Sequence, residues 1–227
     1  MGAPDILQCV EVEPQGGVPV GGAVIWLHGL GADGHDFEPI VPYLGLDEDR
    51  GGVRFVFPHA PKRPVALNMG LIMRAWYDIR AIDLRRDHDV EGIADSAERI
   101  RALIARENGR GIPTDRIVLS GFSQGGAMAL QTGLRHSERL AGILALSGFL
   151  PLPGTVAAEA SPANRDVPIF MAHGSHDPLV PLARAREAYQ LLTRLGYRVE
   201  WHEYPIPHSV SDAEIRDVAA WLTRILA

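Results

Sequence analysis

Short, continuous apolar runs alternate along this chain with longer stretches in which apolar residues recur at helical spacing. The short runs are too continuous for strands that have one face in water, so they predict strands buried on both faces. They are Ala23–Leu27, Val53–Phe57, Arg116–Leu119, Ile143–Leu146 and Pro168–Ala172. Strands that alternate with helices predict an α/β fold, with a mostly parallel sheet flanked by helices on both faces.

The stretches between these runs carry helix signals. Apolar side chains recur at helical spacing over residues 93–104 and again over residues 185–195, just before Gly196, where a C-terminal glycine cap belongs. Ser211-x-x-Glu214 has the pattern of a capping box and precedes a third amphipathic stretch. These three stretches are predicted helices.

Residues 58–90 break this rhythm. The segment is long, and three of its first seven residues are proline. A long connection in a compact domain is usually a lid or a binding loop. Because no repeat, low-complexity tract or linker divides the chain, we expect one domain over residues 1–227, with 58–90 as an irregular loop or lid within it.

Composition excludes several classes of protein. The chain is 46% apolar and 22% charged with a net charge of −6, so it lacks the basic face that a nucleic-acid partner requires. Cys9 is the only cysteine, which excludes an internal disulfide or a cysteine-based zinc site. No metal or cofactor is predicted. Residues 1–5 lack the features of a signal peptide and no apolar run reaches the length of a membrane span, so we expect a cytoplasmic protein without stable membrane insertion.

Gly121-Phe122-Ser123-Gln124-Gly125 lies between a predicted strand and a helix predicted from Gln124 to about Arg135. In this strand–turn–helix context, G-x-S-x-G is typical of a nucleophile elbow. The serine projects from a strained turn, where side chains two positions away on either side would collide, so both positions are glycine. The alternative is a glycine-rich turn with an incidental serine, which the flanking strand and helix disfavour.

A nucleophilic serine needs a histidine base that is oriented by an acid, and with this elbow the chain order is serine, acid, histidine. Catalytic groups of open parallel sheets lie at the carboxyl ends of strands. Asp177 follows the strand Pro168–Ala172, whereas Asp166 precedes it and the other acids after Ser123 lie in helices, loops or a strand. Asp177 is therefore the predicted acid.

Two histidines follow Asp177. His202 lies within a predicted strand, Val199–Tyr204, and we expect a structural role for it. His208 lies in the loop after that strand and is the predicted base. His173, which precedes a glycine at a strand end, is expected to pack or support rather than react.

His28-Gly29-Leu30-Gly31 follows the first predicted strand, where an elbow of this kind takes its second oxyanion donor. The predicted donors are the backbone N–H groups of Leu30 and Gln124, the latter at the start of the helix. Residues 29–34 also read G-x-G-x-x-G, which on its own suggests a dinucleotide site. That interpretation needs an acid at the end of the next strand to bind the ribose, and Phe57-Pro58-His59-Ala60 contains none.

Taken together, the motifs resemble the phospholipase/carboxylesterase family, which includes acyl-protein thioesterases and small bacterial carboxylesterases. The resemblance extends from about residue 20 to the end of the chain and rests on His28-Gly29-Leu30-Gly31, Arg74-Ala75-Trp76-Tyr77-Asp78, Gly121-Phe122-Ser123-Gln124-Gly125-Gly126, His173-Gly174-x-x-Asp177-Pro178-x-Val180-Pro181 and Pro207-His208. It implies a single-domain α/β-hydrolase with a minimal cap. It also implies a triad of Ser123, Asp177 and His208, with Leu30 and Gln124 as oxyanion donors.

The same resemblance implies hydrolysis of carboxylic esters through an acyl-enzyme. We expect a carboxylesterase for short- to medium-chain esters, with acyl-protein thioesterase or lysophospholipase activity as the alternative and a non-catalytic small-molecule receptor as an alternative of another class. The expected partner is a small-molecule ester or acyl thioester, and a homodimer remains open. An acyl chain needs apolar surface near the nucleophile, and within 58–90 the candidates for it are Leu71, Met73 and Trp76.

Overall fold

A seven-stranded sheet forms the centre of the computed structural model, which describes residues 6–46, 52–80 and 88–226. All neighbouring strands run parallel except β1, which pairs antiparallel with β3 at one edge. In spatial order the strands are β1 (Cys9–Val12), β3 (Gly52–Pro58), β2 (Val20–Leu27), β6 (Ile117–Phe122), β7 (Gly142–Leu146), β8 (Ile169–Gly174) and β9 (Val199–Tyr204). The predicted α/β fold with a mostly parallel sheet is confirmed.

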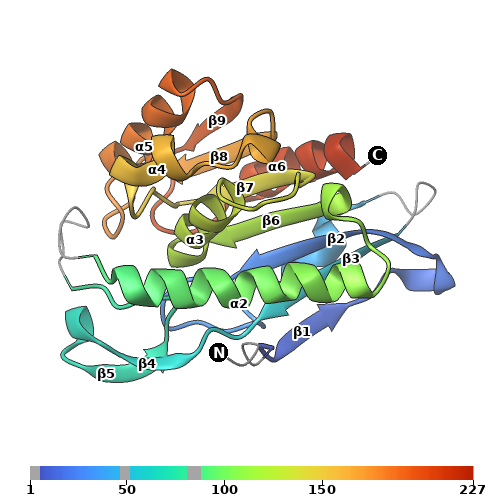
Figure 1. Cartoon of the computed structure of the whole chain (residues 1–227), viewed down its shortest axis with the longest axis horizontal. Helices are drawn as coiled ribbons and strands as arrows, with labels where there is room; N and C mark the ends of the chain where they lie inside the picture. Colours follow the sequence, from blue (N-terminus) through green and yellow to red (C-terminus); the bar gives the residue numbers. More distant parts are fainter. Residues whose placement is uncertain (1–5, 47–51, 81–87, 227) are drawn as a thin grey trace.

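Helices cover both faces of this sheet (Figure 1). They are α1 (Val41–Leu44), α2 (Val90–Gly109), α3 (Gln124–Gly133), α4 (Val156–Glu159), α5 (Leu182–Arg194) and α6 (Asp212–Leu226). One core cluster joins the sheet to α2, α3, α4 and α5, and the other joins the opposite face to α1 and α6. Within β2, Ile25 and Leu27 belong to the first cluster and Val24 and Trp26 to the second. Successive side chains of a strand point to opposite faces, so a sheet covered on both faces requires continuous apolar runs.

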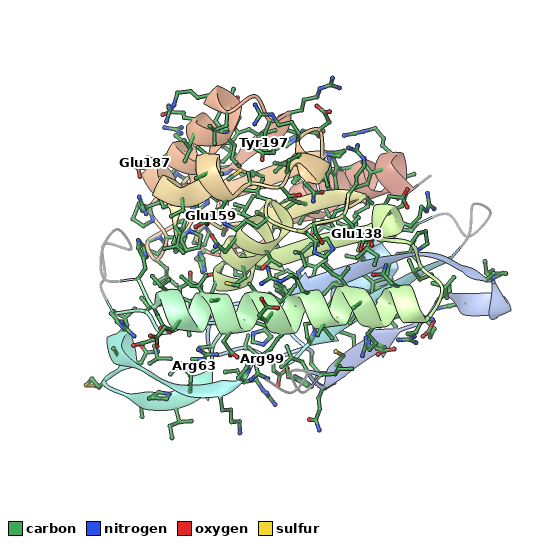
Figure 2. The ribbon with its side chains drawn as sticks, in the orientation of Figure 1. Arg63, Arg99, Glu138, Glu159, Glu187 and Tyr197 are labelled. Carbon is green, nitrogen blue, oxygen red and sulfur yellow. The ribbon has the colours of Figure 1, made fainter. Side chains whose placement is uncertain are left out.

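Residues 58–90 are not wholly irregular, so that prediction was wrong. They contain a two-stranded antiparallel hairpin, β4 (Lys62–Val65) and β5 (Leu71–Arg74), which lies below α2 in Figure 1. Arg63 of β4 reaches Asp95 of α2 at 3.5 Å, and Arg99 of α2 contacts the same carboxylate at 3.1 Å; both arginines are labelled in Figure 2. Part of the segment, residues 81–87, lies outside the described residues.

The predicted element boundaries differ from the observed ones in several places. The helix after the elbow ends at Gly133 rather than near Arg135. Gly196 does have the positive φ of a C-terminal cap, at 87°. The capping-box serine of α6 acts as predicted, because Ser211 Oγ accepts from the N–H of Glu214 at 3.2 Å.

Candidate active site

Ser123 occupies the turn between β6 and α3 with φ of 56° and ψ of −119°, a strained conformation for a residue with a side chain. Two glycines make this turn sterically feasible. A Cβ on Gly121 would lie 2.3 Å from the carbonyl carbon of Gly125, and one on Gly125 would lie 2.1 Å from the carbonyl oxygen of Leu27. The turn is fixed by the N–H of Ser123, which donates to the carbonyl of Leu146 at 2.8 Å. The sequence therefore specifies an elbow that holds Ser123 at the end of the central strands.

His208 bridges Ser123 and Asp177. Its Nε2 lies 2.9 Å from Ser123 Oγ, and its Nδ1 lies 2.6 Å from Asp177 Oδ2. The Asp177 side chain is fully buried and that of His208 is 12% exposed. An ionised carboxylate only accepts hydrogen bonds, so Nδ1 carries the proton and Nε2 is left to accept from the serine hydroxyl. This is the arrangement of a nucleophile, a general base and an orienting acid.

The Asp177 carboxylate is held by its own loop after β8. Its Oδ1 accepts from the N–H groups of Leu179 at 2.8 Å and Val180 at 2.9 Å, whereas Oδ2 lies 2.6 Å from His208 Nδ1 and 3.4 Å from His173 Nε2. His173, at the end of β8, lies with Nε2 2.8 Å from the carbonyl of Val180. Burial lowers the pKa of His173, so the ring is neutral and its Nε2–H donates. His173 thus supports the acid's loop, in line with the supporting role predicted for it.

The loop that carries His208 follows β9 and is hydrogen-bonded to the loop after β8. Ser175 N–H donates to the carbonyl of Tyr204 at 2.7 Å, and His176 N–H donates to the carbonyl of Ile206 at 3.1 Å. The two loops approach so closely that a Cβ on Gly174 would lie 2.4 Å from the Ile206 carbonyl oxygen. This contact places Asp177 and His208, 31 residues apart in sequence, side by side.

The loop after β2 lies against the elbow. A Cβ on Gly29 would lie 3.5 Å from Ser123 Cβ, and Gly31 N–H donates to the carbonyl of Arg74 at 2.9 Å. In the described part of the chain, the N–H groups of Leu30 and Gln124 have no hydrogen-bond acceptor. No helix begins within residues 28–37, whereas a dinucleotide-binding loop leads directly into one.

The three candidates for the acyl-binding wall have different surroundings. Leu71 is 60% exposed on the hairpin, and Met73 is half-buried with its sulfur 3.7 Å from the position of a Cβ on Gly31. Trp76 is fully buried, and its indole N–H donates to the carbonyl of His28 at 2.9 Å. Trp76 therefore offers no surface to a ligand in this structure, because its ring fills the core between α2 and the sheet.

His202 and His28 both lie outside the hydrogen-bonded triad. The ring of His202 stacks on Phe170 at 4.8 Å, and its Nε2 lies 3.1 Å from Glu200 Oε1. Burial lowers the pKa of His28 to about 4, and this neutral ring accepts from Ala60 N–H at 3.0 Å. Within residues 6–46, 52–80 and 88–226, no group of three or more His, Cys, Asp or Glu side chains is arranged to hold a metal ion.

Sequence reasoning missed two contacts of the elbow. The ring of Phe122 lies 4.8 Å from that of His208 and packs against the base. The side-chain amide of Gln124 hydrogen-bonds to the backbone of residues 76 and 77, which precede it by almost 50 positions. Both residues stand inside the G-x-S-x-G motif, but the motif's spacing does not indicate what its variable positions contact.

The chain is similar to known proteins over almost its whole length. Residues 7–226 match the model of the Phospholipase/Carboxylesterase family. Acyl-protein thioesterase 1 of Gibberella zeae is 42% identical over 211 residues, which cover 89% of this chain and 90% of that protein. Acyl-protein thioesterase 1 of Mycosarcoma maydis is 38% identical over an aligned length of 235 residues, which covers 97% of this chain and 98% of that protein.

Solved structures show the same fold. The structure of Zea mays acyl-protein thioesterase 2 superposes with a TM-score of 0.84 at 27% identity and covers 97% of this chain and 99% of that one. In the part of the chain that the structure describes, no helix is long and apolar enough to cross a lipid bilayer.

Both the family model, which matches residues 7–226, and the relative of 42% identity show the family. The chain belongs to the phospholipase/carboxylesterase family of α/β-hydrolases.

Proposed function

We propose that this chain is an acyl thioesterase that releases acyl groups from cysteine thioesters, including those of acylated proteins, and that also hydrolyses carboxylic esters. The observation that carries the proposal is the hydrogen-bonded series Ser123–His208–Asp177 beside the Gly29–Gly31 loop. The preference for thioesters draws on relatives of 42% and 38% identity that are named acyl-protein thioesterases.

In the proposed first step, Ser123 Oγ attacks the thioester carbonyl carbon while its proton passes to His208 Nε2. The carbonyl oxygen becomes an oxyanion, which accepts hydrogen bonds from the N–H groups of Leu30 and Gln124. The C–S bond then breaks, and the protonated Nε2 gives its proton to the departing sulfur. A thiol and an acyl-Ser123 result.

Water completes the cycle. His208 Nε2 accepts a proton from a water molecule, whose oxygen attacks the acyl carbon of acyl-Ser123. A second tetrahedral oxyanion forms at the same donors and collapses when His208 returns the proton to Ser123 Oγ. The carboxylic acid leaves, and the enzyme regains its starting protonation state. Asp177 stabilises the positive charge on His208 during both steps.

The acyl chain is proposed to extend from Ser123 toward the hairpin. Met73 and Leu71 alternate with Ile72 along β5 and so share one face of it. Met73 lies beside Gly31, next to the proposed oxyanion donor Leu30, and its flexible thioether suits chains of different shapes. Trp76 would support this wall from within the core rather than contact the chain.

A pair of peptides tests the proposed preference. Both carry the same octanoyl group, one on cysteine sulfur and one on serine oxygen, and kcat/KM is measured for each. A thiol, with a pKa near 8.5, leaves more readily than an alcohol, so we expect kcat/KM for the thioester to be at least about tenfold higher. Equal values, or a higher value for the oxyester, would favour the carboxylesterase alternative. Turnover of neither peptide and of no p-nitrophenyl ester would favour a non-catalytic receptor.

A further inference from the structure

The side chain of Gln124, the residue after the nucleophile, forms two hydrogen bonds to the backbone. Its Oε1 accepts from Trp76 N–H at 2.8 Å, and its Nε2 donates to the carbonyl of Tyr77 at 2.7 Å. The residue is only 2% exposed. A side-chain amide has both a donor and an acceptor, so it can satisfy the buried Trp76 N–H and the buried Tyr77 carbonyl at the same time. An apolar side chain could satisfy neither group, and a carboxylate could satisfy only the N–H.

The backbone that Gln124 holds is fixed at several further points. Trp76 donates its indole N–H to the carbonyl of His28 at 2.9 Å, and its own carbonyl accepts from Ser96 Oγ of α2. Two residues before Trp76, the carbonyl of Arg74 accepts from Gly31 N–H at 2.9 Å. Residues 74–77, from the last residue of β5 onward, therefore contact the elbow through Gln124 and the loop after β2 through both His28 and Gly31.

These contacts join the two halves of the proposed oxyanion site. One donor, the Gln124 N–H, belongs to the elbow, and the other, the Leu30 N–H, lies on the loop between His28 and Gly31. Stabilisation of an oxyanion depends on donors already placed at hydrogen-bonding distance from the developing charge, so a small displacement of one donor lowers the rate. Residues 74–77 are hydrogen-bonded to both halves, which also pack directly against each other.

We propose that the Gln124 side chain is a positioning residue, which holds residues 74–77 against the elbow and thereby sets the Leu30 N–H at its distance from the reacting carbonyl. This role rests on the proposed function and is separate from that of the Gln124 backbone N–H, which every substitution at this position retains. It also couples the hairpin to the reacting centre, because β5 leads directly into the held segment.

The test compares Gln124→Met with a control, Gln131→Met. Gln131 is also buried in α3, but its Oε1 has no hydrogen-bond partner in the described residues. Active-site concentration is titrated first, so that kcat refers to folded enzyme. For Gln124→Met we expect kcat to fall by about 10- to 100-fold with KM within about twofold of wild type. An alkyl boronic acid, which forms a tetrahedral adduct on serine, should lose affinity by the same factor as kcat/KM. Gln131→Met should match wild type in all three quantities.

A second variant keeps the test decisive if Gln124→Met fails to fold. Gln124→Glu keeps the size and the acceptor for Trp76 N–H, but when ionised it has no donor for the Tyr77 carbonyl. Protonation restores a donor, so the ratio of kcat/KM for Gln124→Glu to that for wild type should rise as pH falls. A pH-independent ratio would overturn the proposal, as would Gln124→Met with wild-type kcat per titrated site. Failure of the proposed function is distinguishable, because it is measured on wild type alone. A kcat/KM for the oxyester equal to or above that for the thioester would end the thioester preference and leave the comparison of the Gln124 variants intact. A wild type that neither turns over nor binds the boronic acid would end the hydrolase assignment itself.

Discussion

Asp177 uses its two carboxylate oxygens differently. Oδ1 accepts from two backbone N–H groups of its own loop, whereas Oδ2 faces His208. These two donors fix the rotation of the side chain, so the atom in the place of Oδ2 must face His208 Nδ1. An ionised carboxylate at this position can accept a hydrogen bond from His208 but has no proton to donate to it.

Asp177→Asn should lower kcat on the order of 10⁴-fold while the protein remains folded. The backbone N–H groups of Leu179 and Val180 will hold the amide oxygen, which turns the amide NH₂ toward His208. His208 Nδ1 must then accept, so its proton moves to Nε2, where it can no longer accept from Ser123. Steady-state kinetics on a p-nitrophenyl ester measure the loss. Retention of more than about a tenth of wild-type kcat would refute this role for Asp177.

His202→Gln provides the matched control for the histidines. This side chain stacks on Phe170, on the sheet face covered by α6, and it contacts Glu200 rather than Ser123. We expect kcat and KM within about twofold of wild type in the same assay. Loss of activity on the scale of the Asp177 variant would mean that the base has been assigned to the wrong histidine.

At the scale of elements, β5 combines structural and proposed binding roles. The wall proposed for the acyl chain lies on one face of β5, and Arg74, the last residue of β5, hydrogen-bonds to the loop that carries the proposed oxyanion donor Leu30. Met73→Ala should reduce kcat/KM for an octanoyl ester about tenfold more than for an acetyl ester, since only the longer chain would bury apolar surface against Met73. A series of p-nitrophenyl esters measures the profile.

Ile72→Ala is the control for this profile, because Ile72 alternates with Met73 to the other face of β5 and is 73% exposed. It should leave the dependence on chain length unchanged. An equal loss for Met73→Ala at every chain length would place the acyl-binding surface elsewhere and leave Met73 a role in packing alone.

Helix α6 contains a buried carboxyl group that affects stability. Glu214 is 1% exposed, and burial raises its pKa to about 8. Between pH 4.5 and 8 the folded protein binds a proton that the unfolded chain releases, so the free energy of unfolding falls as pH rises through this range. Glu214→Gln should remove this fall and be more stable than wild type by roughly 2–4 kcal/mol at pH 9, with little difference below pH 4.5.

Urea unfolding at several pH values measures the effect, with Asp212→Asn as the control. Asp212 lies in the same first turn of α6 but is exposed, so its substitution should preserve the pH dependence of wild type. Parallel pH profiles for Glu214→Gln and wild type would show that Glu214 is ionised in the folded protein, contrary to its burial.

Sequence patterns predicted the elements that have strong local signals. Strands buried on both faces, such as β2 and β7, have continuous apolar runs, and α2 shows its buried side chains at helical spacing. The patterns missed β1, an edge strand of four residues, and the hairpin, whose β4 contains Pro64 and has Val65 as its single buried residue. Short strands at the surface need little apolar sequence, so their periodicity is too weak to identify them.

At the scale of the whole molecule, the candidate site depends on the ends of β2, β6, β8 and β9 meeting at one edge of the sheet. That convergence could be predicted, because parallel strands place their carboxyl ends together. Each of Ser123, Asp177 and His208 stands just after one of these strands, and the fold brings them into hydrogen-bonding distance. The contact of Gln124 with residues 76 and 77 could not be predicted, since it depends on how the hairpin packs.

Mass spectrometry of the trapped intermediate tests most directly whether Ser123 forms the covalent acyl-enzyme. The enzyme is mixed with excess p-nitrophenyl octanoate, quenched in acid within the first turnovers, digested and mapped. We predict an octanoyl group on the peptide that contains Ser123, at that residue alone, and its complete absence from Ser123→Ala, which should keep the wild-type melting temperature and lose turnover. An octanoyl group on another residue, or a Ser123→Ala variant that still hydrolyses the ester, would show that Ser123 is not the nucleophile.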